Sequence, residues 1–157
     1  MECIKLNKLC DINIGKTPSR KESRYWGKGN KWVSISDLNG KYIYVTKEEI
    51  TQEAVDECNM KLIPKGTVLM SFKLSVGKVA ITGEDMYSNE AIANFPIKDE
   101  NILIPEYLYY ALQTLDFSSI IDRAAKGITL NKKKLEEIKI PYVDVKIQHK
   151  IVQVLDK

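Results

Sequence analysis

The chain has 157 residues, of which 44% are hydrophobic and 29% are charged, and its formal net charge is +3 at pH 7. A chain of this length can bury the core of one domain without disulfides, and this composition excludes a disordered or low-complexity protein. The cysteines fit no metal-binding motif and His149 is the only histidine, so we expect no metal site. No segment resembles a signal peptide or reaches transmembrane length, so we expect a cytoplasmic protein without a membrane partner.

Charge is distributed unevenly along the chain. Residues 16–31 contain six basic side chains and one acid, whereas residues 84–106 contain six acids and one base. The net charge alone is weak evidence for a nucleic-acid partner. The basic segment, however, predicts that one side of the molecule is positively charged.

Strands are predicted for the N-terminal third. Residues 4–14 alternate loosely between apolar and polar types, which fits a short strand. The polar segment 15–31 follows, and residues 32–36 then alternate with the period of two that is typical of a half-buried strand. Asn39-Gly40 is a strong turn signal, and the Tyr, Ile and Val side chains of residues 41–45 predict a second strand.

One helix and three further strands are predicted for the middle of the chain. Thr46 and Glu49 match the capping box of a helix that we expect to extend to about Cys58. Residues 64–66 predict a turn. Apolar and β-branched side chains then predict strands at 67–71, 78–82 and 91–97, with segment 73–77 joining the first two.

Helices are predicted for the C-terminal third. Pro105 suits the first helical position, and the residues that follow are apolar at three- and four-residue spacing. A second helix is expected at about 118–126 with Gly127 as its stop, and Asn131 is expected to cap a short helix that ends at Glu137. The remaining elements are an extended segment and a terminal helix, at 138–141 and 145–157.

The order of strands first and helices last predicts an α+β domain with a mixed or antiparallel sheet and a C-terminal helix. On that helix, Ile147, Ile151 and Leu155 recur at four-residue steps and form an apolar seam. Two interpretations of the seam are open. It is either a surface for a partner helix or the face that docks onto the same domain.

Six segments resemble, in order, the specificity subunits of type I restriction–modification systems. The most characteristic is a glycine followed by Thr17-Pro18-Ser19, then Tyr25-Trp26, then the strand segment 32–37. The others are residues 62–69 with Gly77, 88–91, 107–112, 126–129 with 140–141, and 148–157. Each segment is short, but together and in this order they cover nearly the whole chain.

The resemblance implies a target-recognition domain at residues 1–143 and the start of a conserved spacer helix at residues 144–157. A full subunit of that family is similar to two such domains joined by long antiparallel helices, each domain reading one half of a bipartite double-stranded DNA target. The implied partners are modification (methyltransferase) subunits, a restriction subunit, and a second specificity half or another copy of this chain. Catalysis and S-adenosylmethionine are then expected on the partners, so this chain is expected to be no enzyme and to bind no cofactor.

Three segments supply what a DNA reader needs, namely cations for phosphates and groups that reach base edges. In the basic segment, Arg20 and Arg24 have the fork geometry that binds guanine O6 and N7. The turn at Gly77 and the N-terminus of the helix after Asn131 are the other two. The candidate residues are Lys16, Thr17, Ser19, Arg20, Lys21, Arg24, Lys28 and Lys31 in the first, Lys73, Ser75 and Lys78 in the second, and Lys126, Thr129, Lys132 and Lys133 in the third.

Each candidate has a structural alternative: a solvated loop, a plain β-turn, and an exposed helix face. Tyr25 and Trp26 can stack on a base or sugar, but we interpret them as apolar anchors for the basic loop. Two other functions also stay open. Asp122, Glu137 and Lys139 resemble the Asp…Glu-x-Lys pattern of metal-dependent nucleases, and the terminal helix suits a protein-interaction module that binds no DNA.

Overall fold

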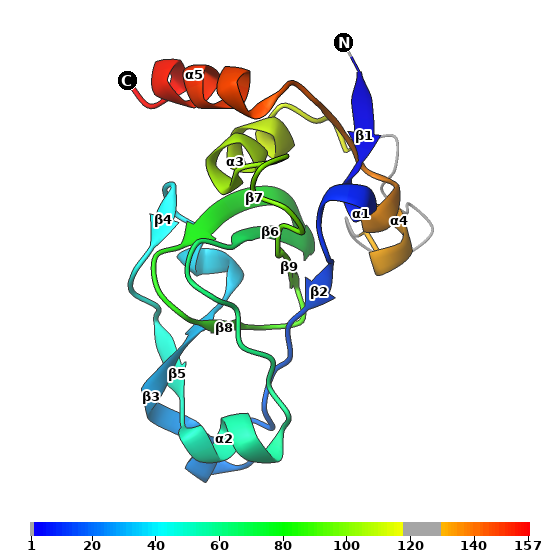
Figure 1. The fold of residues 1–157 in the computed structure, drawn as a ribbon. Helices are drawn as coiled ribbons and strands as arrows, with labels where there is room; N and C mark the ends of the chain where they lie inside the picture. The colour runs from blue at the N-terminus through cyan, green and yellow to red at the C-terminus, as the bar shows by residue number, and fades with distance from the viewer. Residues whose placement is uncertain (1, 118–129) are drawn as a thin grey trace.

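A five-stranded sheet lies at the centre of the chain, whose computed structural model describes residues 2–117 and 130–157 (Figure 1). Its strand order is β2-β9-β6-β7-β4, and every pair is antiparallel except β4 with β7. This mixed sheet with accompanying helices confirms the predicted α+β class. The strands are β2 (Asn13–Ile14), β9 (Ile92–Phe95), β6 (Val68–Lys73), β7 (Ser75–Thr82) and β4 (Tyr42–Ile43).

The β6–β7 hairpin forms because both strands are apolar and β-branched, as predicted. Its strands are longer than expected, so segment 73–77 is not a free-standing loop. Lys73 is paired with Ser75, and Leu74 alone connects the strands. The predicted strand at 91–97 is confirmed in shorter form as β9, and the turn at Gly66, which has a φ of +84°, is also confirmed.

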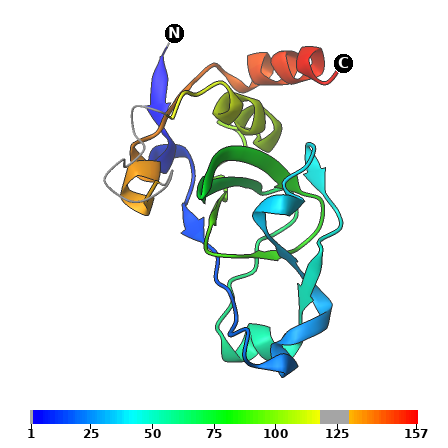
Figure 2. The same cartoon turned by 180° about the vertical axis from the view of Figure 1, so that it is seen from behind.

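Helices α3 (Pro105–Gln113) and α5 (Val145–Leu155) lie on one side of this sheet (Figures 1 and 2). Pro105 lies in the first turn of α3. The predicted apolar face of this helix is buried against β6 and β7. The main core lies between these helices and the sheet, and Phe72, Phe95 and Leu108 are fully buried in it. Burying this apolar area is the main stabilising contribution to the fold.

A two-stranded sheet pairs β1 (Cys3–Lys5), near the N-terminus, with β10 (Lys139–Pro141), and α1 (Leu6–Leu9) and α4 (Lys132–Glu137) lie beside it. Asn131 caps α4 by accepting a hydrogen bond from the backbone N–H of Lys134 at 2.8 Å, as predicted. Segment 4–14, which was predicted to hold a short strand, contributes to two short strands, β1 and β2, with α1 between them. The helix predicted at 118–126, with its stop at Gly127, lies outside the described residues.

A second lobe is built on the three-stranded sheet β5-β3-β8 (Figure 1). Its elements are β3 (Trp26–Val33), β5 (Glu48–Ile50), β8 (Tyr87–Ser88), α2 (Gln52–Glu57) and the 3-10 helices η1 (Ser23–Tyr25) and η2 (Ile35–Asp37). Trp32, Ile50 and Met60 belong to the small core of this lobe. β3 begins inside the basic segment and ends before residue 36, so the predicted bounds of this strand were wrong.

The predicted start of the helix in this lobe was also wrong. The helix predicted to start at Thr46 is α2, which Thr51 caps by accepting a hydrogen bond from the backbone N–H of Ala54. Thr46 instead precedes β5, because pairing with β3 holds residues 48–50 extended. Asn39-Gly40 makes the predicted turn, and the strand predicted at 41–45 is confirmed in shorter form as β4, which pairs in parallel with β7.

The terminal helix α5 is attached to the domain at both of its ends. Near its start, the buried Gln148 accepts a hydrogen bond from the N–H of Ile104 at 3.0 Å and donates to the carbonyls of Ile102 and Val143, each at 2.8 Å. At its end, Asp156 pairs with Lys41 at 2.5 Å.

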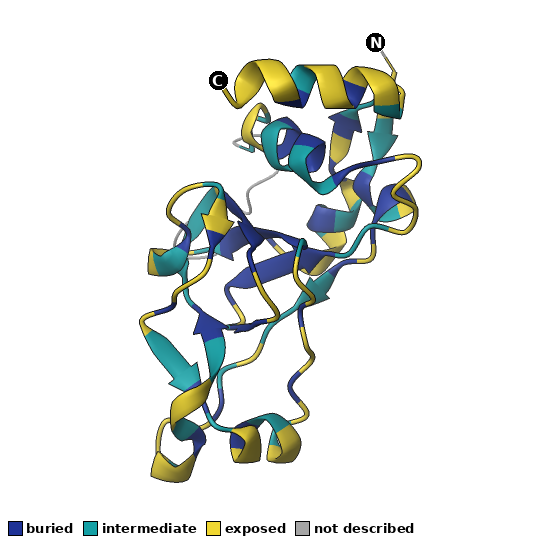
Figure 3. Ribbon diagram, turned by 60° about the vertical axis from the view of Figure 1, so that its left-hand side comes forward, coloured by how far each residue is buried: buried dark blue, intermediate teal, exposed yellow. Residues whose placement is uncertain are grey.

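Tyr110 of α3 also donates a hydrogen bond to Asp156. Together Lys41 and Tyr110 lower the pKa of the Asp156 carboxyl, which stays ionised at neutral pH. The outer face of α5 is exposed (Figure 3). Within the described residues, no helix combines the length and apolar character needed to cross a bilayer.

Candidate nucleic-acid interface

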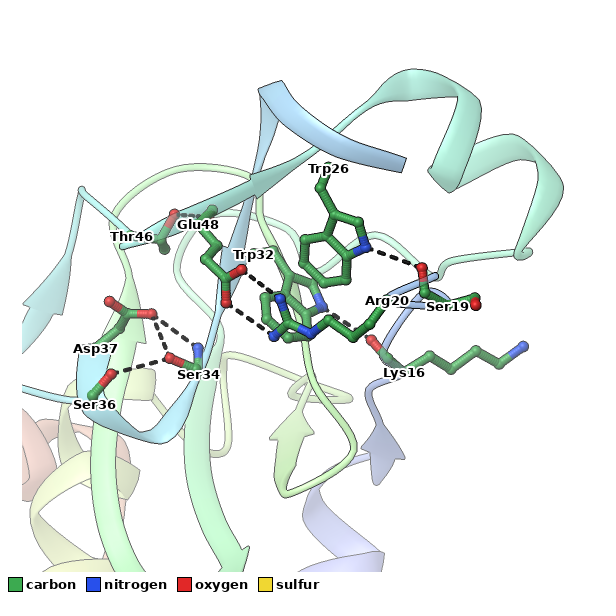
Figure 4. Close-up of polar contacts among 10 residues, drawn as sticks. All are labelled: Lys16, Ser19, Arg20, Trp26, Trp32, Ser34, Ser36, Asp37, Thr46 and Glu48. Carbon is green, nitrogen blue, oxygen red and sulfur yellow. Dashed lines mark hydrogen bonds and ion pairs between the residues drawn. The ribbon is translucent and has the colours of Figure 1, made fainter. Parts of the chain in front are cut away.

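The basic segment is fixed to the second lobe by two tryptophans (Figure 4). The indole N–H of Trp32 donates to the carbonyl of Lys16 at 3.0 Å, and that of Trp26 donates to the carbonyl of Ser19 at 3.1 Å. The two rings pack edge to face with centroids 5.0 Å apart. The structure thus confirms the anchoring role of Trp26, and Tyr25 is buried beside it.

Arg20 lies over this aromatic pair and is held by a carboxylate. Its guanidinium carbon is 4.0 Å from the ring centroid of Trp26, and its two terminal nitrogens donate to the Glu48 carboxylate at 2.5 and 3.0 Å. The hydrogen bond from Arg20 lowers the pKa of Glu48. Both side chains remain about half exposed. The structure therefore presents Arg20 to solvent in one orientation, with its fork already occupied.

Arg24 is surrounded by acids. Its guanidinium forms ion pairs with Glu22 at 3.2 Å, Glu53 at 3.4 Å and Glu57 at 2.9 Å. The Tyr25 hydroxyl donates to the same Glu57 carboxylate at 3.1 Å. Because Glu53 and Glu57 belong to α2, Arg24 connects η1 to that helix.

The other candidates of the basic segment divide into bonded and unbonded side chains. Lys31 pairs with Glu84 at 2.7 Å, Lys16 donates to the carbonyl of Cys58 at 3.3 Å, and Thr17 donates to Glu90. The side chains of Ser19, Lys21 and Lys28 are exposed, and they have no ion pair or hydrogen bond among the described residues.

A polar turn beside Arg20 was missed in the sequence analysis. In η2, the Asp37 carboxylate accepts hydrogen bonds from the N–H and hydroxyl of Ser34 at 2.9 and 3.1 Å, and from the N–H of Lys47 at 3.1 Å. Ser36 is exposed in this turn, and its hydroxyl oxygen lies 3.2 Å from that of Ser34 (Figure 4). The Ser-x-x-Asp spacing of residues 34–37 is a capping-box signal that predicts such a turn. Ser36 is therefore a further candidate for contact with base edges.

The second and third candidate segments come together on the main body. The N–H of Leu130 donates to the carbonyl of Phe72 at 2.7 Å, which places the start of α4 beside the end of the β6–β7 hairpin. We refer to the four described lysines of these two segments together as the hairpin cluster: Lys73, Lys78, Lys132 and Lys133. None of them forms an ion pair within the described residues, and Lys78, Lys132 and Lys133 are exposed.

The other members of these segments are placed as follows. Ser75 begins β7 and is half-buried. Lys126 and Thr129 lie outside the described residues. The nuclease candidate is not assembled by the part of the chain that is described. Asp122 lies outside it, Glu137 pairs with Lys5 at 3.3 Å, and no cluster of three metal-ligating side chains occurs there.

The apolar seam of α5 divides between the two interpretations. Val152 and Gln148 face the domain and are buried, so the helix does dock onto its own chain. Ile147 and Leu155 are 44% and 50% exposed, and Ile151 is half-buried. An apolar strip thus remains for a partner, and that partner stays a prediction.

Comparison with known proteins identifies relatives over the full length. The family described as type I restriction modification DNA specificity domain matches residues 1–157. The MjaIX specificity subunit of Methanocaldococcus jannaschii is 36% identical, over 96% of this chain and 36% of its own length. The EcoR124I/EcoR124II specificity subunit of Escherichia coli is 30% identical, over 91% of this chain and 37% of its own.

Solved structures share the fold. The HsdS subunit of Thermoanaerobacter tengcongensis superposes with a TM-score of 0.74 at 23% identity, over 99% of this chain and 36% of that one. A structure of a type I R-M system, solved for its assembly and conformational transition, has a TM-score of 0.78 at 22% identity, with coverage of 99% and 37%. This chain therefore spans little more than a third of the length of its relatives.

Proposed function

Since the chain belongs to the type I restriction modification DNA specificity domain family, we propose that it reads one half of a bipartite double-stranded DNA target. The family match over residues 1–157 is the observation that carries this proposal. Residues 1–143 form the target-recognition domain, and residues 144–157 begin the spacer helix. The chain is the specificity component of a larger complex and performs no catalysis itself.

The described cations fall into two groups, those without an acidic partner and those paired with carboxylates, and we assign the two groups different contacts with DNA. The hairpin cluster and the exposed Lys21 and Lys28 have no acidic partner among the described residues, so they are available to phosphates. Lysine contacts to phosphates release counterions and supply affinity that is independent of sequence.

Arg20 suits the reading of a base. An exposed ion pair such as Arg20–Glu48 contributes only about 0–1 kcal/mol, whereas a bidentate contact to guanine discriminates by about 1–3 kcal/mol. Guanine can therefore replace Glu48 as the partner of the fork. The ring of Trp26 holds the guanidinium in place during the exchange. The released carboxylate of Glu48 is then free to accept from a cytosine amine.

Partners supply the chemistry. The modification subunits hold S-adenosylmethionine, a restriction subunit cleaves, and this chain binds neither a cofactor nor a metal. The exposed strip of Ile147, Ile151 and Leu155 receives a helix of a second specificity half or of another copy of this chain. The complex acts in the cytoplasm.

A selection of bound duplexes from a random pool tests the proposal. The chain is combined with its methyltransferase partner, and bound DNA is sequenced after selection at low and at higher salt. We expect a short motif that persists as salt rises. Binding that disappears uniformly with salt and enriches no motif would contradict the proposal, and metal-dependent cleavage by the isolated chain would favour the nuclease alternative.

A further inference from the structure

Leu74 is an unusual residue at the tip of the β6–β7 hairpin. It is the single residue between the paired Lys73 and Ser75, and its φ is +66°. Its side chain is 83% exposed, more than any other large hydrophobic side chain in the described part of the chain.

The fold does not explain why this position is a leucine. At positive φ the Cβ of an L-residue crowds the backbone, so glycine or asparagine is favoured there. A buried side chain could offset that strain by packing, but Leu74 is nearly fully exposed and recovers little. A strained backbone conformation that no packing within the described chain offsets points to a contact of Leu74 with another molecule.

The surroundings of Leu74 indicate a polyanion. Lys73 is its neighbour in the chain, Lys78 follows on β7, and the N-terminus of α4 with Lys132 and Lys133 starts beside the hairpin. The described residues offer these four lysines no acidic partner. The hairpin itself is stiff, because β6 is paired on both of its edges, with β7 and with β9.

We propose that Leu74 is a wedge that inserts at a base step of the bound duplex while the hairpin cluster holds the flanking phosphates. This inference rests on the proposed function and adds a contact that reads deformability rather than base edges. An apolar side chain that enters a groove partly unstacks the step and kinks the duplex, which flexible pyrimidine–purine steps permit most readily. Insertion also removes the exposed apolar surface of Leu74 from water.

Substitutions at Leu74 separate the wedge from the fold. Leu74→Gly and Leu74→Asn relieve the backbone strain and remove the apolar bulk, whereas Leu74→Met retains the bulk as a matched control. We expect Leu74→Gly to raise the melting temperature of the chain and to weaken binding of the selected duplex about tenfold, the loss expected when part of a leucine side chain is no longer buried. Leu74→Met should bind within about twofold of the unchanged chain.

A direct probe of unstacking is 2-aminopurine, placed in turn at each step of the selected motif and measured with the chain and its methyltransferase partner. We expect a rise in fluorescence at one step, absent with Leu74→Gly and present with Leu74→Met. If Leu74→Asn, which lacks the extra unfolded-state entropy of glycine, lowers the melting temperature, Leu74 packs within the chain and the wedge is wrong. If Leu74→Gly binds DNA normally but loses the methyltransferase, the tip contacts protein, which also overturns it.

Different outcomes overturn the proposed function and the proposal that Leu74 is a wedge. If the unchanged chain selects a motif but Leu74→Gly binds it equally well and no step unstacks, only the wedge is overturned. If the unchanged chain selects no motif, both are overturned.

Discussion

The basic loop of residues 16–31 in the second lobe and the hairpin cluster of the main body differ in how many of their cations are paired with acids. In the loop, Arg20, Arg24 and Lys31 are each paired with carboxylates. In the hairpin cluster, none of the lysines has an acidic partner within the described residues. The number of basic residues in a segment therefore does not give the positive charge that is available to DNA, because acidic partners neutralise some of these residues. The loop has the higher density, but the cluster has more unpaired charge.

The largest expected effect comes from neutralising the hairpin cluster. Each lysine that contacts a phosphate contributes a slope of about −0.9 to the dependence of log K on log salt. Replacing four should reduce the slope by about three to four and weaken binding roughly a thousandfold near 0.1 M salt. The variant has glutamine at Lys73, Lys78, Lys132 and Lys133, and binding is titrated from low to high salt.

The control for that prediction has glutamine at four other exposed lysines, Lys65, Lys146, Lys150 and Lys157. It changes the net charge by the same amount and should leave the salt slope nearly unchanged. Equal losses in the two variants would show that total charge, rather than the hairpin cluster, determines affinity.

The next effect concerns specificity. Arg20→Ala should relax selection at one base of the motif by about 1–3 kcal/mol while lowering the salt slope by at most about one. Arg20→Lys retains the charge but not the fork, so it should also lose that base. Motif selection with each variant measures this. A uniform loss across all sequences would make Arg20 a phosphate contact like those of the hairpin cluster.

Arg24 should behave as a structural residue. Arg24→Ala removes the connection between η1 and α2, so we expect the melting temperature to fall by a few degrees, as is typical for a modest destabilisation of a chain of this size. The selected motif and the salt slope should stay unchanged at a temperature where the variant is folded. If Arg24→Ala instead loses the preference for one base of the motif, Arg24 contacts DNA.

The smallest effect is the pH dependence of the Arg20–Glu48 pair. The folded state lowers the pKa of Glu48, so the pair stabilises the chain above the ordinary carboxyl pKa of about 4.3 and loses this contribution as pH falls through the lowered value. Because both groups are about half exposed, we expect less than about 1 kcal/mol. Urea unfolding should show Glu48→Gln to be less stable than the unchanged chain at pH 7, with the difference shrinking as the pH falls below the ordinary carboxyl pKa of about 4.3.

Elements with strong local signals were predictable from the sequence. Pro105 and the periodicity after it identified α3, and Asn131 identified the start of α4. Two threonines show where local signals are insufficient. Thr46 has the better capping pattern, but Thr51 caps the helix, because β5 pairs with β3 across an interval that no local pattern reveals.

The candidate site shows the same limit. Charge patterning located Arg20 and Arg24, but their partners Glu48 and Glu57 are 28 and 33 residues away in the sequence. Which cations are neutralised therefore depends on tertiary structure. The exposure of Leu74 likewise follows from strand register, which sets the hairpin tip at that residue.

The two attachments of α5 determine more than its stability. Gln148 and Asp156 are eight residues apart, or about 12 Å along a helix. A helix fastened at one point can pivot about it, whereas one fastened at two such points keeps a fixed bearing relative to the sheet. A partner that docks on the exposed strip of α5 is then held at a fixed angle and distance from Arg20 and the hairpin cluster. The helix therefore sets the position of that partner relative to the residues proposed to bind DNA.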